Sequence, residues 1–214
     1  YLDTDKWYAN PGSIHSYHSC FAPPHRTRDK LVFESTPNYM YHPEVPRRLH
    51  AYNPELKLIV LLRDPAERAL SAWIMNHHHF NSGPYRHLHD SRSFEDAVED
   101  ELRDVGPVDF STNRIGYVHR GIYHEQLRRV FEYFSRDQVL VLEGPALLSD
   151  YERTMTRILD FLGVRGVIPP NRGKRSETNQ AAYAGTLRRL REFYRPHNAA
   201  LFDMLGQRYE WDGS

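Results

Sequence analysis

Residues 58–73 read LIVLLRDPAERALSAW, and this stretch decides the fold of the chain. Its first five residues form an unbroken apolar run, which is the pattern of a strand buried on both faces of a sheet. Arg63 ends the run. Asp64 then takes the N-cap position of a helix, with Pro65 at the first helical position and Glu67 where a capping box places its acid. The stretch therefore predicts a buried strand that turns at once into a capped helix.

A strand that leads directly into a helix is a common phosphate site, because the first N–H groups and the helix dipole point at the anion. Arg63 would add a bidentate guanidinium at the end of the strand. Ser71 lies two helical turns beyond Asp64 on the same face, so its hydroxyl could point toward the same anion. The alternative is an ordinary strand–helix junction with a surface arginine and serine, and these residues alone leave both interpretations open.

Composition limits the class of protein. A chain of 214 residues can bury one sizeable core. Its 28 basic and 28 acidic residues balance, so no overall charge attracts nucleic acid or a membrane surface. Cys20 is the single cysteine, which rules out an internal disulfide. No apolar run approaches the ~18 residues of a membrane span, and we find no signal peptide. We therefore expect one cytoplasmic domain over residues 1–214, with no nucleic-acid partner.

Apolar spacing and turn residues predict the remaining elements. Two further strands are expected, at Lys30–Glu34 and Gln138–Leu142. Helices are expected at residues 43–52, 93–104, 121–134, 150–162 and 181–205. Ser93 is a predicted N-cap, and Gly163 a predicted C-terminal stop. Strands that alternate with helices indicate an α/β fold with a central parallel sheet flanked by helices.

The central stretch, preceded at residues 33–57 by FESTPNYMYHPEVPRRLHAYNPELK, resembles the 3′-phosphate-binding region of sulfotransferases. The likeness is closest to the glycan-modifying branch that includes heparan sulfate sulfotransferases. That branch tends to read Glu-Lys-Thr/Ser-Pro-x-Tyr, Val-Pro-x-Arg, Asn-Pro and Arg-Asp-Pro-x-Glu-Arg-x-x-Ser in this order. The likeness continues through residues 121–123, 150–163 and 190–212. It implies the sulfotransferase fold, a three-layer architecture like that of the P-loop NTPases.

The resemblance also implies a reaction, the transfer of a sulfuryl group from 3′-phosphoadenosine 5′-phosphosulfate (PAPS) to a hydroxyl or amine of a carbohydrate or small molecule. By the match, Arg63 and Ser71 bind the 3′-phosphate, in agreement with the independent interpretation of the junction. Lys174 and Arg175 match a Lys-Gly-Arg loop that closes over the nucleotide, although a solvated basic loop is the alternative. Tyr123 matches a position near the nucleotide, although a tyrosine in this helical pattern also fits core packing.

One departure from the family concerns catalysis. Family members begin with a strand and a turn, roughly Lys-x-Gly-Thr, that holds the 5′-phosphosulfate, and a catalytic glutamate follows on the second strand. Neither occurs in this sequence, and Tyr1-Leu2-Asp3 resembles the segment just after that glutamate. We therefore expect the domain to be N-terminally incomplete, with the base and the leaving-group lysine upstream of Tyr1, and the chain as given to be inactive.

The acceptor side carries a second departure. Ser35 stands where the glycan branch often has a lysine near the reaction centre, so it is expected to line the site without taking part in the chemistry. His77 and His79 follow the helix that carries Ser71, in a region that borders the acceptor cleft in the family, and Asp3 could stand there by the same match. These four residues are the candidates for acceptor binding. Consecutive helical side chains diverge by about 100°, so the histidine run does not predict a metal site.

Two other functions stay open at this point. A non-catalytic module that binds adenosine 3′,5′-bisphosphate (PAP) fits the missing N-terminal elements. A P-loop kinase would share the parallel sheet, but it requires GxxxxGK[ST], which does not occur in this sequence. If the chain comes from a secretory-pathway relative, the Golgi lumen replaces the cytoplasm as its location. The sequence does not identify the acceptor or the oligomeric state.

Overall fold

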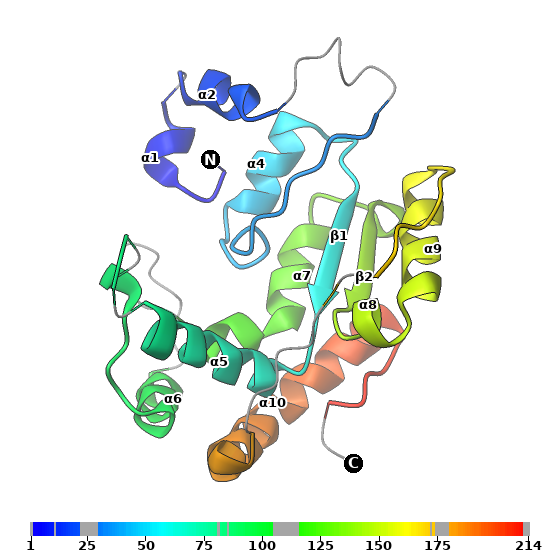
Figure 1. Cartoon of the computed structure of the whole chain (residues 1–214). Helices are drawn as coiled ribbons and strands as arrows, with labels where there is room; N and C mark the ends of the chain where they lie inside the picture. The colour runs from blue at the N-terminus through cyan, green and yellow to red at the C-terminus, as the bar shows by residue number, and fades with distance from the viewer. Residues whose placement is uncertain are drawn as a thin grey trace. The chain divides into compact units, whose positions relative to one another are not determined.

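The computed structural model (Figure 1) describes residues 2–10, 12–21, 30–80, 82–84, 86–104, 116–171, 173 and 180–211, without the side chains of residues 6 and 79. The chain divides into two compact units. The first contains residues 1–56 and 126–135, and the second contains residues 57–125 and 136–214. Across the described ranges, we find no helix whose length and apolar content would let it cross a bilayer.

The first unit is mainly helical. It holds α1 (Asp5–Tyr8), α2 (Ser13–Ser19), α4 (Val45–Tyr52) and the greater part of α7 (Tyr123–Phe131). Its buried apolar side chains include Leu2, Val45, Leu49, Leu127 and Phe134. Arg48 ties the N-terminal residues to α4, because its Nη1 donates to the Leu2 carbonyl at 2.8 Å and its guanidinium lies 4.6 Å from the centre of the Tyr8 ring.

The predicted strand at Lys30–Glu34 is wrong. Residues 31–36 have no regular secondary structure, and Leu31, Val32 and Phe33 are exposed, the last by 88%. A strand must pair its backbone N–H and C=O groups with a neighbour. In the described part of the chain this segment does not join the sheet, which consists of β1 and β2, so its apolar composition alone does not make it a strand.

The second unit contains the sheet, which consists of two parallel strands in the described part of the chain. They are β1 (Leu58–Leu62) and β2 (Val139–Glu143), with Leu58 opposite Val139. Both strands were predicted. Helices α8 (Ala146–Ser149) and α9 (Tyr151–Leu162) pack against β2, and α9 ends at Gly163, whose φ of 70° is the left-handed conformation predicted for that stop.

The faces of β1 differ from the prediction. Leu62 is buried, but Ile59 and Leu61 are 38% and 50% exposed, so the expectation of burial on both faces is wrong. The physical reason lies in the sheet. Within the described ranges β1 has β2 as its single strand neighbour, and its other edge is unpaired. An apolar strand of this kind is covered fully only when further strands and helices extend the sheet on both sides.

The remaining elements of the second unit surround its core. α5 (Pro65–Ile74) continues as the π-helical turn η1 (Met75–His79) and is followed by η2 (Arg86–Leu88), α6 (Phe94–Arg103), η3 (His119–Gly121), η4 (Arg136–Gln138), η5 (Gln180–Tyr183) and α10 (Ala184–Leu205). Side chains from α5, α6, α10 and the segment before α7 form the core: Ala66, Ala69, Leu70, Trp73, Phe94, Ala97, Val98, Tyr117, Val118, Ile122, Leu187, Leu190 and Tyr194.

One glycine fixes how closely α10 approaches η3. A Cβ atom on Gly121 would lie 2.5 Å from the Tyr194 ring, so no larger residue fits there unless the ring moves. The same tyrosine donates its hydroxyl hydrogen to the Val118 carbonyl at 2.7 Å. Tyr194 is fully buried, and its two contacts set the position of the first half of α10 against the segment before α7.

Candidate functional site

The junction between β1 and α5 has the cap that the sequence predicts. Asp64 Oδ1 accepts hydrogen bonds from the backbone N–H groups of Ala66, at 2.7 Å, and Glu67, at 3.3 Å. The Glu67 carboxylate lies 3.7 Å from the guanidinium of Arg191. The predicted N-cap is therefore confirmed, and the acid three residues later joins an ion pair with α10.

Arg63 follows the last residue of β1 and is half-buried. Its Nη2 donates to the Arg68 carbonyl at 3.4 Å, which is a long and weak contact, and this is the single side-chain hydrogen bond that it makes within the described ranges. Burial lowers the pKa of the Arg63 guanidinium below its ordinary value, although the group stays charged at neutral pH. Arg63 therefore presents a cation whose remaining donors are available to an anion.

Tyr123 packs against this arginine. The phenol is buried, and its ring meets Trp211 edge-on at 5.9 Å. Burial raises the pKa of the Tyr123 hydroxyl, while the charges of Arg68 and Arg63 and a hydrogen bond with the Arg63 backbone act in the opposite direction. Tyr123 is thus placed beside the candidate site, as the resemblance implies, in a buried position where it also packs the core.

Of the other three predicted nucleotide-binding residues, one lies in a described position. Ser71 lies on α5, is half-buried, and belongs to the same compact unit as Arg63 and Tyr123. Lys174 and Arg175 lie outside the described residues. The second unit therefore holds three of the five predicted nucleotide-binding residues in described positions.

The four candidates for acceptor binding are divided between the two compact units. In the first unit, the Asp3 carboxylate accepts a hydrogen bond from Asn38 Nδ2 at 3.4 Å, and Ser35 is exposed. In the second unit, the His77 ring stacks on Trp73 at 4.5 Å, and its Nδ1 lies 2.8 Å from the Asp90 carbonyl oxygen. The side chain of His79 lies outside the described residues.

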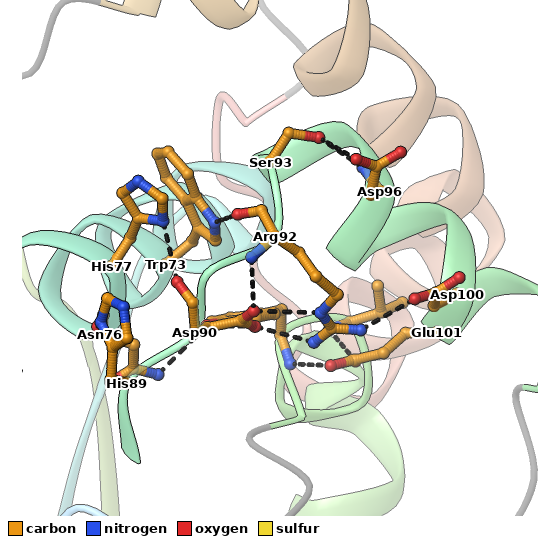
Figure 2. Close-up of polar contacts among 12 residues, drawn as sticks. Trp73, Asn76, His77, His89, Asp90, Arg92, Ser93, Asp96, Asp100 and Glu101 are labelled. Atoms are coloured by element: carbon orange, nitrogen blue, oxygen red, sulfur yellow. Dashed lines mark hydrogen bonds and ion pairs between the residues drawn. The ribbon is translucent and has the colours of Figure 1, made fainter. Parts of the chain in front are cut away.

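Sequence reasoning missed a polar network around Asp90, which joins buried acids to exposed charges (Figure 2). Arg92 directs Nε and Nη2 to the carboxylate of Asp90, at 3.0 and 2.7 Å, and Nη1 to Asp100 at 2.9 Å. The hydrogen bonds that Arg92 donates to Asp90 are the main cause that raises the pKa of the Arg92 guanidinium. Burial acts to raise the pKa of the Asp90 carboxyl, but the Arg92 contacts outweigh it and hold that pKa below its ordinary value.

Glu101 completes the network from α6. Its two carboxylate oxygens accept hydrogen bonds from the backbone N–H groups of Tyr117, at 2.8 Å, and Val118, at 2.7 Å. The Tyr117 hydroxyl donates to Asp90 at 3.2 Å. Glu101 is one of several acidic residues of α6, and the sign of its role in the sequence is that it falls on the apolar side of that helix. The network fixes the segment before α7.

A second missed residue lies on α10. Arg191 Nε donates to Asp64 Oδ2 at 3.0 Å, so the cap residue of α5 is also half of an ion pair. Burial raises the pKa of the Asp64 carboxyl, and the charge and hydrogen bond of Arg191 oppose that shift. No sequence pattern could have linked these two residues, because they are 127 positions apart.

Among the described side chains, no group of three or more His, Cys, Asp or Glu residues could hold a metal ion.

Comparisons with known proteins agree with the sequence resemblance. A family described as "Sulfotransferase domain" matches residues 32–178. Human heparan sulfate glucosamine 3-O-sulfotransferase 3A1 is 30% identical, across 88% of this chain and 50% of that protein. Human heparan sulfate glucosamine 3-O-sulfotransferase 6 is also 30% identical, across 87% of this chain and 58% of that protein. The chain therefore spans about half the length of the curated relatives it matches.

A solved structure matches the fold. The crystal structure of a sulfotransferase from Alicyclobacillus acidocaldarius superposes with a TM-score of 0.69, covering 96% of this chain and 79% of that one, at 21% sequence identity. This likeness confirms the predicted α/β class with a parallel sheet flanked by helices.

Proposed function

The chain belongs to the sulfotransferase family, and from this we propose that it acts in the transfer of a sulfuryl group from PAPS to a hydroxyl or amine of a carbohydrate. The single observation that carries the proposal is the junction at the end of β1. There a half-buried arginine with available donors stands beside the capped N-terminus of a helix that also carries a serine. The pattern suits a phosphate ester, because the arginine supplies a positive charge with directed N–H donors and the serine supplies a hydroxyl donor.

The proposed role of the junction is to recognise the 3′-phosphate. Arg63 would donate two parallel hydrogen bonds to phosphate oxygens, and Ser71 would donate one from the same face of α5 as the cap. Tyr123 would support Arg63 from the core side. Lys174 and Arg175 are proposed to close over the nucleotide. A 3′-phosphate distinguishes this donor from ATP, so these residues would set the choice of nucleotide.

The proposed acceptor is a glycan. The support is that relatives at about 30% identity are named for heparan sulfate glucosamine. Asp3, Ser35, His77 and His79 remain the proposed acceptor-binding residues. His77 is held by its stack on Trp73 and by the Asp90 carbonyl oxygen, which favours a fixed ring that orients an acceptor. The choice between O- and N-sulfation is not assigned.

We propose one sulfotransferase domain over residues 1–214, since the family match at residues 32–178 runs through both compact units. The catalytic base and the leaving-group lysine are still predicted to lie upstream of Tyr1. The cytoplasmic location finds no support among the relatives, and the Golgi lumen is the better fit to a heparan sulfate acceptor.

Calorimetric titration of the 214-residue chain with PAP, with AMP as the control ligand, tests the proposal. Binding that requires the 3′-phosphate and is lost in Arg63→Ala supports it. Equal binding of PAP and AMP would overturn the assignment of Arg63. Sulfuryl transfer from PAPS to a heparan sulfate oligosaccharide is then measured. PAP binding without transfer would favour the non-catalytic module.

A further inference from the structure

We infer that Arg191 is a positioning residue for the nucleotide site, which it serves by neutralising Asp64 so that Arg63 stays available to the phosphate. The inference rests on the proposed function of Arg63. Asp64 carries a negative charge and directly follows Arg63, the cation proposed to bind the 3′-phosphate. Two adjacent opposite charges attract each other, and a second cation paired with the acid offsets its negative charge.

Asp64 needs a counter-charge. Its side chain is 9% exposed, and a carboxylate in that position loses most of its hydration. One of its oxygens is used by the two backbone N–H groups at the start of α5. The other oxygen receives Nε of Arg191 at 3.0 Å. Both oxygens of Asp64 therefore accept directed hydrogen bonds, and none of the three donors belongs to Arg63.

Arg191 is itself held in place. It lies between Leu190 and Tyr194, which are buried side chains of α10. Tyr194 is fixed by its bond to the Val118 carbonyl and by its close approach to Gly121. A second contact of Arg191, Nη2 to Glu67 Oε1 at 3.7 Å, joins it to the first turn of α5. The guanidinium thus contacts two acids of α5 from a rigid helix.

The consequence of losing Arg191 follows from these contacts. Without Arg191, Asp64 would stay buried but would lose its counter-charge. Arg63, the residue directly before it, would then take the place of that counter-charge, and the two side chains would pair. A phosphate would have to compete with that pair for the same guanidinium. Arg191 therefore affects nucleotide affinity without touching the nucleotide, through a neighbouring acid.

The test compares PAP affinity in five forms of the 214-residue chain: wild type, Arg191→Met, Asp64→Asn, the double variant, and Arg195→Met as the matched control. Arg195 is exposed one turn later on the same helix. We expect Arg191→Met to weaken PAP binding by about tenfold, which is typical of a residue that orients a primary ligand, and Arg195→Met to leave it unchanged. We expect no further loss from Arg191→Met in the Asp64→Asn background, because asparagine carries no charge to capture Arg63.

Two results would overturn the inference. One is equal PAP affinity of Arg191→Met and Arg195→Met. The other is an equal loss from Arg191→Met with and without Asp64→Asn, since a purely structural effect would persist after the charge is gone. If Arg191→Met does not fold, Arg191→Gln takes its place with the same outcomes. Failure of the proposed function is distinct, because the wild-type chain itself would then not prefer PAP to AMP.

Discussion

Arg63 and Arg92 belong to the same compact unit, the first half-buried and the second exposed, and they are used in opposite ways. Arg92 directs three nitrogens to two carboxylates at 3.0 Å or less. Arg63 has a single side-chain hydrogen bond at 3.4 Å within the described ranges. The pKa of the Arg92 guanidinium is raised by the hydrogen bonds it donates to Asp90, and the pKa of the Arg63 guanidinium is lowered by burial. The difference teaches that a satisfied arginine stabilises the fold, whereas an arginine with available donors can bind a ligand.

The largest expected effect is on the free energy of unfolding, through the hydrogen-bond network that contains Arg92 and Glu101. Glu101→Ala leaves the backbone N–H groups of Tyr117 and Val118 without their acceptor. Each buried donor that loses its partner costs about 1–3 kcal/mol, so for two donors we expect a loss of about 2–6 kcal/mol in the free energy of unfolding, measured in urea. Glu101→Gln, which keeps one acceptor oxygen, should lose less. An unfolding free energy unchanged by Glu101→Ala would contradict a structural role for the network.

The next largest effect is on nucleotide affinity, through Arg63. Arg63→Ala should weaken PAP binding by about 2–3 kcal/mol, because the 3′-phosphate loses its charged partner. The free energy of unfolding should change little, since Arg63 makes one weak hydrogen bond. Arg92→Ala is the matched control, and it should show the reverse: lower stability with PAP affinity retained. If both substitutions affected the same quantity, the comparison would fail.

A smaller effect is expected for the serine that shares the helix face. Ser71→Ala removes one neutral hydrogen-bond donor, so PAP affinity should fall by about 1 kcal/mol, or roughly fivefold, in the same calorimetric titration. Ser149→Ala, at the C-terminal end of α8, is the control. A loss as large as that of Arg63→Ala would mean that Ser71 does more than assist the arginine.

The smallest effect is a difference in acid sensitivity. The pKa of Asp90 is lowered on folding, so its contribution to stability is present above the unfolded pKa and is lost as the pH falls through the folded pKa. The pKa of Asp64 is raised, so its contribution increases as the pH falls through the folded pKa. Between about pH 5 and pH 2, Asp90→Asn should therefore flatten the fall of the unfolding free energy, and Asp64→Asn should steepen it. Urea unfolding at a series of pH values measures both slopes, and equal slopes would refute the opposite signs.

The sequence predicted local features well. Both strands of the observed sheet, the Asp64 cap, the Ser93 cap and the Gly163 stop depend on neighbouring residues, and all are present. Ser93 Oγ, for example, accepts the backbone N–H of Asp96 at 3.0 Å. The family resemblance also led to the correct fold class, because several motifs in a fixed order are specific together.

Features that depend on distant partners were not predictable from sequence. The apolar segment Lys30–Glu34 reads as a strand, but a strand exists only with a neighbour. Glu101 reads as part of an acidic surface, although its acceptor role depends on a loop 16 residues away. The pairing of Arg191 with Asp64 spans 127 positions. For the candidate site, the sequence thus predicts which side chains bind, and the structure adds an ion pair, Arg191 with Asp64, that we infer keeps Arg63 available.

The unpaired edge of β1 has a consequence for handling the purified protein. Exposed apolar side chains beside a row of unpaired backbone groups form a template for another strand, and natural proteins protect such edges with charge. Within the described ranges, β1 has such an unpaired edge and carries Ile59 and Leu61 as exposed apolar side chains. Light scattering from concentrated solutions should therefore increase over time, and lysine in place of Leu61 should suppress that increase, because a charge at the edge disfavours intermolecular β-pairing.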